Sequence, residues 1–269
     1  MRLWNLFLHI AVQCLSLLPS PIQRKAYKLA VGNKQMNFDL HPNSIWVGYE
    51  IHNETEILKR IPEDLELCPV SVFKTLPAKK YLFFNFFGVA CDYLNGNRLE
   101  IVTVVQDKIS KMKRFIILDY YSNTISSDPM HPFKKPNARI MDLVSSPKYL
   151  SAYCDEKYIF VGKKLPRLKL LSSEFSIGCN KNIFYGTPKI HLPNYLEFDH
   201  ALISKVQMFE SFSVHNQLWT SSVNNLTAPS IAFYYPRAIP FKIITAKKYE
   251  APENYNDDLP LESFAFYDF

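Results

Sequence analysis

Glycine is scarce in this chain, with only 7 glycines in 269 residues against 18 prolines, 16 tyrosines and 20 phenylalanines. No two of the glycines lie closer together than eight positions. This spacing excludes the motifs built from paired glycines, namely the G-x-G-x-x-G dinucleotide loop, the G-x-x-x-x-G-K-[ST] phosphate loop and the G-x-S-x-G nucleophile elbow. The sequence therefore excludes the common nucleotide-binding and α/β-hydrolase classes.

A strong excess of one charge is also lacking, because 31 Lys and Arg against 25 Asp and Glu leave a net charge of +6. The basic clusters are scattered along the chain, which favours solvated loops over a nucleic-acid interface. The seven histidines form no H-E-x-x-H or H-x-H pair, and no carboxylate–histidine cluster has the local spacing of metal ligands. The sequence predicts no nucleic-acid partner, no metal and no cofactor.

Cysteine is sparse as well, and no C-x-x-C pair occurs. Cys14 lies near the start of the chain, which leaves Cys68, Cys91, Cys154 and Cys179 as an even set with three pairings open. At this low density in a long chain, buried free thiols are the favoured interpretation.

The amino-terminal segment Met1 to Pro19 has one Arg before an apolar stretch, as in a signal peptide or a short membrane anchor. It is shorter than the roughly 20 apolar residues of a spanning helix. Polar residues recur at four-residue spacing, at Asn5, His9 and Gln13, which is typical of an amphipathic helix. Two alternatives stay open: residues 1–20 are a secretory signal, or they are a helix retained on the domain or on a membrane through residues 1–18. The first places the protein in the secretory pathway and the second at a membrane, with the cytoplasm as the further alternative.

Strands dominate the rest of the sequence, and helical signals are few. Asn53 with Glu56 three residues on predicts a short helix that ends before Pro62, and Leu94-Asn95-Gly96-Asn97 predicts a hairpin turn. The fold class is predicted as α+β, mostly antiparallel β, in a single domain over residues 21–250, with an acidic and aromatic tail over 251–269. Aromatic and β-branched segments predict strands at 44–51, 69–74, 81–92, 98–106, 114–121, 157–162, 166–171, 176–184, 201–212 and 230–235.

The segment that carries chemistry is a loop bracketed by prolines, in which Lys134 and Lys135 follow the aliphatic strand at 114–121. Adjacent lysines repel each other's charge. If one of them is also removed from water, its pKa falls and its neutral amine becomes a nucleophile toward carbonyl groups. Taken alone, such a pair is most often surface charge.

Four ordered motifs resemble the acetoacetate decarboxylase-like superfamily over residues 44–245. The resemblance implies a β-rich, cone-like barrel around an apolar pocket, with a divergent active-site loop. The four motifs are Ile57 to Glu66, similar to an early helix and turn; Phe133-Lys134-Lys135 with Ala138, similar to the active-site loop; Ser213-Val214-His215 with Leu218-Trp219-Thr220, similar to a late strand; and Tyr235-Pro236-Arg237-Ala238, similar to the closing segment.

The resemblance also implies roles for individual residues. Lys134 would form a Schiff base with a small keto acid, and Lys135 would be the cation that lowers the pKa of its amine. The pocket glutamate of the family falls near residues 81–88, where this chain offers Asn85. The implied substrate-binding residues are Asn85, Phe87, His215 and Arg237.

Three hypotheses follow for function. The first is a Schiff-base enzyme, a carbon–carbon lyase that acts on a small keto acid with Lys134 or Lys135 as its nucleophile. The second is a non-catalytic barrel that binds a hydrophobic small molecule or a lipid, with the aromatic strand Phe83 to Phe87 as its wall. The third is a structural subunit of a membrane-associated complex. A homo-oligomer is compatible with each of them.

Overall fold

The computed structural model describes most of the chain in fine detail. The described residues are 3–19, 21–23, 25–26, 35–73, 75–90, 95–109, 111, 113–126, 134–166, 170–172, 182–187, 190–198, 205–219 and 228–245.

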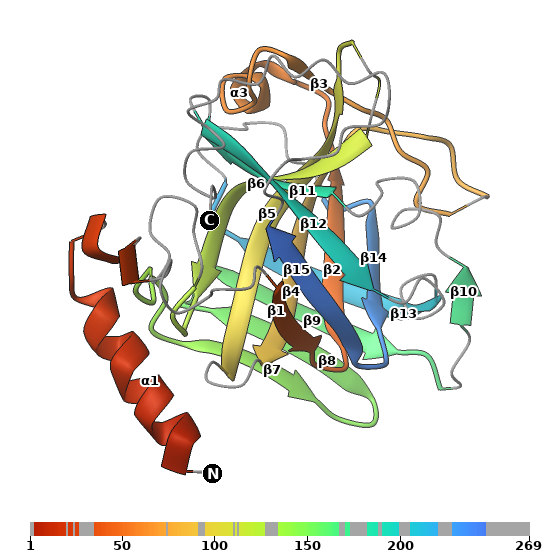
Figure 1. Ribbon diagram of the computed structural model, residues 1–269. Helices are drawn as coiled ribbons and strands as arrows, with labels where there is room; N and C mark the ends of the chain where they lie inside the picture. The colour runs from red at the N-terminus through yellow and green to blue at the C-terminus, as the bar shows by residue number, and fades with distance from the viewer. Residues whose placement is uncertain are drawn as a thin grey trace.

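The described chain consists mainly of strands, with short helical segments at its amino-terminal side (Figure 1). The helices are α1 (Leu3–Ser16) and α3 (Thr55–Leu58). The strands are β1 (Gln35–Leu40), β2 (Ser44–Glu50), β3 (Leu65–Leu67), β4 (Tyr81–Ala90), β5 (Asn95–Asp107), β6 (Lys113–Ser122), β7 (Met141–Ser145), β8 (Tyr149–Cys154), β9 (Tyr158–Lys164), β10 (Leu170–Ser172), β11 (Asn182–Thr187), β12 (Ile190–Phe198), β13 (Lys205–Asn216), β14 (Ile231–Tyr235) and β15 (Ile239–Thr245).

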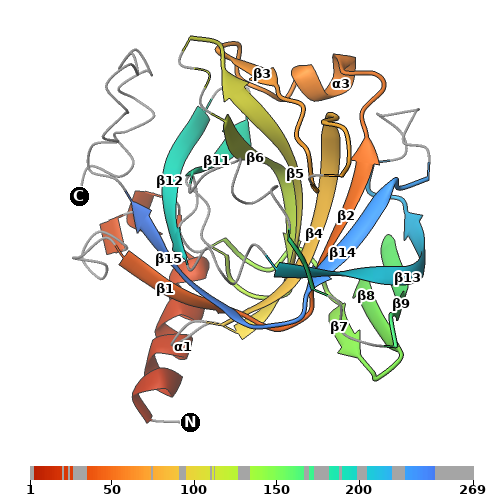
Figure 2. The same cartoon turned by 90° about the vertical axis from the view of Figure 1, so that its right-hand side faces the viewer.

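The strand pairings return to their starting point and so form a closed circuit. From β4 the hydrogen-bonded neighbours run through β5, β6, β11, β12, β15 and β1, and β1 pairs again with the end of β4. The β6–β11 pair is parallel, and the others in the circuit are antiparallel. Figure 2 looks down this circuit. The mostly antiparallel, barrel-like fold predicted from the sequence is confirmed.

A second branch leaves the circuit at β4 and continues through β2, β14, β13, β9, β8 and β7. The β7–β8–β9 end of this branch packs against the outer face of the sheet. Phe84 of β4 stacks on Tyr158 of β9 with ring centroids 5.3 Å apart and parallel planes. This outer core is almost entirely apolar. Burial of so much aromatic and aliphatic surface stabilises the layered arrangement.

The opposite face of β2, β4, β5 and β6 is concave and carries its own apolar core. The rings of Trp46 on β2 and Phe115 on β6 are 5.8 Å apart, although β4 and β5 separate their strands. On a flat sheet, three strand spacings would place these residues roughly 14 Å apart. The sheet therefore curls toward this side, which is the interior of the barrel.

A β-bulge decides which residues of β6 face this interior. The register between β5 and β6 shifts between Ile101 and Val102, so that Ile101 pairs with Asp119 while Val102 pairs with Ile117. Regular alternation from Ile117 would turn Asp119 inward and Tyr120 outward. The extra residue instead places Tyr120 in the interior core.

Some local predictions from the sequence hold and others do not. The β4–β5 hairpin is confirmed, although Asn95 and Gly96 belong to β5 and the connection at 91–94 lies outside the described residues. The Asn53 amide oxygen accepts a hydrogen bond from the Thr55 N–H at 3.0 Å, but the N-cap residue of α3 is Glu54, and α3 is a single turn. The strand predicted at 69–74 is wrong. Among the described residues of that range, 69–73, only Val70 makes a ladder pair, an isolated one with Lys79, and the neighbouring strand β3 lies at Leu65–Leu67.

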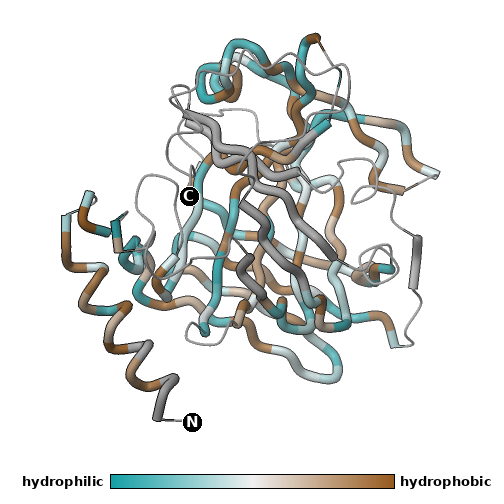
Figure 3. Tube along the Cα trace, in the orientation of Figure 1, coloured by the Kyte–Doolittle hydropathy of each residue, from teal (hydrophilic) through white to brown (hydrophobic). Residues whose placement is uncertain are grey.

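Helix α1 lies at the periphery of the molecule (Figure 1), and Figure 3 shows hydrophobic residues along much of it. Leu6, Phe7 and Ile10 are exposed, whereas Val12 and Ser16 are buried. Within the described residues, no helix has the length and apolar character needed to cross a membrane. Whether residues 1–20 are a signal or a membrane-associated helix stays a prediction, and the predicted tail at 251–269 lies outside the described residues.

The cysteines that the structure describes are free thiols. Cys68 and Cys154 are buried and Cys14 is exposed. Burial raises the pKa of the Cys154 thiol to about 12, which suits an inert core residue. Cys91 and Cys179 lie outside the described residues.

Candidate functional site

A short row of polar side chains interrupts the aromatic interior. Asn85 on β4 lies directly opposite Glu100 on β5, and Glu100 lies directly opposite Tyr120 on β6. Side chains opposite each other in antiparallel pairs have Cβ atoms about 4.5–5.5 Å apart. The register therefore brings an amide, a carboxyl and a phenol side by side on the inner face.

Arg98 adds a cation to this row. It lies two residues before Glu100 on β5, so both side chains project from the same face. Their Nε and Oε1 atoms are 2.6 Å apart, and both side chains are nearly fully buried. Burial raises the pKa of the Glu100 carboxyl, and the Arg98 charge only partly opposes this rise. Glu100 thus holds its proton to higher pH than an exposed glutamate does.

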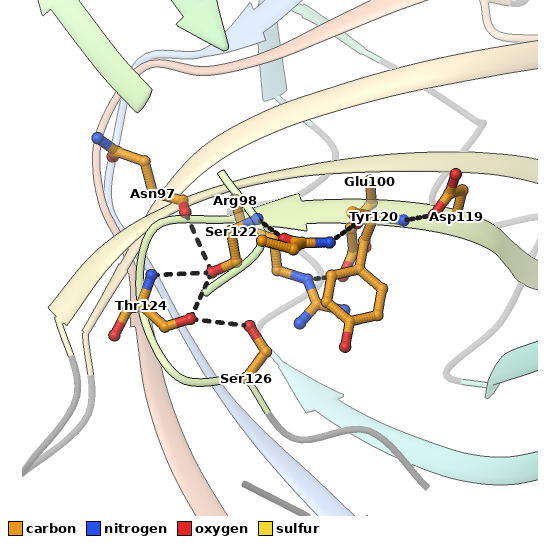
Figure 4. A network of polar contacts seen from close by, with 9 residues as sticks. Asn97, Arg98, Glu100, Asp119, Tyr120, Ser122, Thr124 and Ser126 are labelled. Carbon is orange, nitrogen blue, oxygen red and sulfur yellow. Dashed lines mark hydrogen bonds and ion pairs between the residues drawn. The ribbon is translucent and has the colours of Figure 1, made fainter. Parts of the chain in front are cut away.

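Two cationic side chains, those of Arg98 and Lys134, contact the ring of Tyr120. The Arg98 guanidinium carbon lies 4.0 Å from the ring centroid, and the Lys134 Nζ lies 4.4 Å from the same centroid. The two cations are therefore no farther apart than the sum of these distances. Figure 4 shows Arg98 and Glu100 beside the Tyr120 ring. With one carboxyl and two cations, the group favours a negatively charged ligand.

Hydrogen bonds on both sides of Lys134 fix its backbone. The Lys134 N–H donates to the Ser126 carbonyl at 2.9 Å, and the Ser126 N–H donates to the Lys134 carbonyl at 3.0 Å. Three residues on, the Asn137 Oδ1 accepts from the Ser122 N–H at 2.7 Å and its Nδ2 donates to the Tyr120 carbonyl at 2.8 Å. The segment that carries Lys134 is thereby attached to the end of β6 that carries Tyr120.

A second carboxylate lies near Lys134. Burial raises the pKa of the Asp119 carboxyl. A hydrogen bond that this carboxyl accepts from the Tyr120 N–H lowers its pKa, and so do the charges of Arg60 and Lys134. The Arg60 guanidinium lies 4.5 Å from the ring centroid of Trp219, a buried residue of the predicted late motif. The charge of Lys134 therefore lowers the pKa of Asp119, while its Nζ contacts the ring of Tyr120.

The predicted site residues fall into two groups. Asn85 and Phe87 are buried, and both lie on the inner face of β4, where Phe87 pairs with Arg98. Lys134 is half-buried at Tyr120, whereas the adjacent Lys135 is exposed. The cationic side chain that contacts the same ring as Lys134 is that of Arg98, and the described structure gives no such contact for Lys135.

The other two predicted substrate-binding residues are not brought to this group. His215 is exposed on β13, opposite Ile159 of β9, in the outer branch of the sheet. Arg237 is exposed between β14 and β15. Their predicted binding role stays a prediction that the row around Glu100 does not involve.

Three residues of the row were missed from the sequence: Arg98, Glu100 and Tyr120. Two opposite charges spaced two apart within the apolar run RLEIVTVV were a usable signal, because they must share one face of a strand whose next residues on that face are Val102 and Val104. Tyr120 gave no signal, since its orientation depends on the bulge. Among the described residues, no group of three or more His, Cys, Asp or Glu side chains could hold a metal ion.

Comparison with known proteins supports the fold. No protein-family model matches the sequence, and no curated protein matches it. The solved acetoacetate decarboxylase from Legionella pneumophila is 12% identical, with 79% of this chain and 87% of that chain covered at a TM-score of 0.51. The enduracididine biosynthesis enzyme MppR complexed with pyruvate is 6% identical, with coverage of 80% and 89% and a TM-score of 0.49. An acetoacetate decarboxylase-like enzyme from Sphingomonas wittichii RW1 is 7% identical, with coverage of 81% and 93% and a TM-score of 0.47.

The chain therefore has an acetoacetate decarboxylase-like fold, as its ordered motifs predicted. At this level of identity the likeness concerns the fold, and the chemistry has to be argued from the side chains of this chain.

Proposed function

We propose that this protein binds a small keto acid inside its barrel and forms a Schiff base with it through Lys134. The observation that carries the proposal is the contact of Lys134 and Arg98 with one ring, that of Tyr120, beside the buried Glu100. The proximity of these three groups supports roles for Lys134 as nucleophile, Arg98 as the cation that binds an anion and Glu100 as proton donor.

Each residue has a role that its surroundings support. The substrate carboxylate is attracted to Arg98, whose guanidinium can bind it through two hydrogen bonds. Lys134 supplies the amine, and its fixed backbone limits the orientations that the amine takes. Burial raises the pKa of Glu100 and so favours its protonated form, which suits the role of general acid that we assign to it.

The reaction proposed for a 3-oxo acid balances without a cofactor. The neutral amine of Lys134 adds to the ketone carbon, and the former carbonyl oxygen takes one proton from the amine nitrogen and a second from Glu100 and leaves as water. The resulting iminium accepts the electron pair of the bond between the carboxyl carbon and its neighbour, so carbon dioxide leaves and an enamine forms. The enamine carbon then takes a proton from solvent, which regenerates the iminium. Water hydrolyses this iminium to the ketone and the free amine, and the proton released returns to the Glu100 carboxylate.

The test is reductive trapping. The full-length protein is incubated with acetoacetate and borohydride, and the intact mass is measured for the wild type, Lys134→Gln and Lys135→Gln. We expect an adduct on the wild type and on Lys135→Gln, with a mass that reports whether the carboxyl group was lost. An adduct that persists in Lys134→Gln, or none on the wild type, contradicts the proposal.

The interior packing favours this proposal over the binding of a lipid or another hydrophobic ligand. Trp46 contacts Phe83, Phe115 and Phe233 at ring-centroid distances of 5.7, 5.8 and 6.3 Å. The apolar half of the interior is thus occupied by side chains that contact one another. The polar half around Glu100 is where a small anionic ligand finds complementary groups. Membrane association through residues 1–18 and assembly into a homo-oligomer stay predictions.

A further inference from the structure

Asn85 presents an unused hydrogen-bond acceptor to the barrel interior. Its side chain is 8% exposed, and its Oδ1 has no hydrogen-bond partner among the described residues. A buried polar atom that lacks a partner destabilises a folded protein by about 1–3 kcal/mol. Such an atom on an inner strand face beside a proposed binding site indicates a ligand group that completes the bond.

The immediate neighbours of Asn85 do not meet this need. Phe83 and Phe87, which flank it on the same face of β4, have no polar group. Glu100, directly opposite, has its carboxyl oxygen 2.6 Å from the Arg98 Nε. Trp46, opposite on β2, packs against Phe83, Phe115 and Phe233.

The position of Asn85 relative to the proposed reaction centre defines the ligand group. Arg98 and Lys134 converge on Tyr120 at one end of the row, where the carboxylate and the ketone would lie. Asn85 lies at the other end, with Glu100 between them. A ligand that spans the row thus places the atoms beyond its ketone at the Asn85 amide.

We propose that the substrate is a keto acid that also carries a hydroxyl group on the carbon beyond its ketone, and that this hydroxyl donates a hydrogen bond to the Asn85 Oδ1. The inference rests on the proposed function and adds the substrate class. A methyl group in the same place leaves the amide oxygen unpaired and removes it from any remaining water. A site built to bind a hydroxyl therefore discriminates strongly against the methyl analogue.

The experiment compares two stable ligands that differ only by a hydroxyl in place of a methyl group, 3-hydroxypyruvate and 2-oxobutanoate. Their dissociation constants are measured by titration calorimetry on the full-length wild type, on Asn85→Leu and on Asn85→Asp. We expect the wild type to bind 3-hydroxypyruvate about tenfold more tightly than 2-oxobutanoate. Asn85→Leu removes this preference, and Asn85→Asp, which keeps an acceptor, retains it.

Each outcome bears on one proposal separately. Equal affinities in the wild type, a preference that survives in Asn85→Leu, or no binding of either ligand overturns the hydroxyl-acid inference. Trapping on Lys134 without a hydroxyl preference leaves the Schiff-base proposal standing and removes the inference alone. A hydroxyl preference without any trapping supports the inference and removes the Schiff-base chemistry. Should Asn85→Leu fail to fold, loss of the preference in Asn85→Asp still contradicts the acceptor role.

Discussion

Asn85 and Glu100 face each other directly across the antiparallel pair of β4 and β5. The resemblance placed a pocket glutamate on the strand that holds Asn85, and this chain has an amide there. Glu100 lies on the neighbouring strand, one pairing step away, and is buried. The interior therefore contains a buried acid with a neutral hydrogen-bonding group beside it.

The protonation of Glu100 predicts a dependence of stability on pH. Because burial raises the pKa of Glu100 in the folded protein, its contribution is complete below the unfolded-state pKa of about 4.3 and is lost as pH rises through the folded-state pKa. The substitution Glu100→Gln removes this ionisation. The free energy of unfolding should then fall less steeply with pH than in the wild type, by up to about 1.4 kcal/mol per pH unit between the two pKa values. Urea unfolding from pH 4 upward measures the slope. The exposed Glu63→Gln is the control and should follow the wild type; parallel slopes for Glu100→Gln and wild type would show that the buried acid does not titrate as described.

Arg98 and Arg237 are alternative anchors for a substrate carboxylate, and their exposure separates them. Arg98 is buried beside Lys134, and Arg237 is exposed. We expect Arg98→Met to weaken the binding of 2-oxobutanoate by about 10- to 100-fold, since a charge-assisted hydrogen bond in a buried site is lost. Arg237→Gln should leave the dissociation constant unchanged. The reverse result in calorimetry would move the anion site to the turn between β14 and β15.

Asn137 attaches the Lys134 segment to β6 through two side-chain hydrogen bonds. Asn137→Ala should lower the free energy of unfolding by about 1–2 kcal/mol and slow the trapping of Lys134 by roughly tenfold, because the amine loses its fixed position. The nearby Arg139→Ala is the matched control, since the described hydrogen bonds of Arg139 come from its backbone N–H. Trapping rates that fall equally in both variants would indicate a general effect of this loop.

Gly48 tests the packing of the inner face. A Cβ atom there would lie 2.6 Å from the Cγ2 of Ile231 and 2.9 Å from the Cε1 of Phe83. Both neighbours are buried residues paired with Gly48 across β14 and β4. Gly48→Ala should therefore destabilise the protein by about 1–3 kcal/mol in denaturant unfolding. Ser211→Ala, on an exposed strand position, should change stability little; a neutral Gly48→Ala would mean that the inner face is looser than the structure has it.

The fold class was predictable from the sequence because runs of aromatic and β-branched residues favour strands locally. The strand Tyr81–Ala90 with its hairpin partner is the clearest case. The ordered motifs predicted the likeness in fold, which is confirmed. Hydrogen bonds attach the segment of Lys134 next to the end of β6, and its role in a site stays a prediction. Strand pairing across distance was not predictable from propensity. The strands β1, β3, β7, β8, β12 and β15 were not predicted. β3 has only three residues, β12 and β15 contain a proline, and β1, β7 and β8 mix strand-forming residues with Asn, Asp, Ser or Ala.

The remainder of the candidate site depends on register. The spacing of Arg98 and Glu100 marks a shared strand face, but only the β4–β5 register brings Glu100 opposite Asn85. Tyr120 faces inward because of the bulge between Ile117 and Asp119. His215 and Arg237 matched motif letters, yet alternation along β13 and the turn after β14 leave both exposed. A motif fixes residue identity, whereas a single-residue shift in register decides which face of the sheet receives the side chain.

The proposed role of Lys134 as the nucleophile is tested most directly by identifying the lysine that carries the reduced adduct. Wild-type protein is trapped with acetoacetate and borohydride, digested with a protease that cleaves at acidic or aromatic residues, and sequenced by fragmentation mass spectrometry. We expect modification at Lys134, with Lys135 of the same peptide unmodified. An adduct on Lys135, or one spread over exposed lysines such as Lys59 and Lys163, would contradict it.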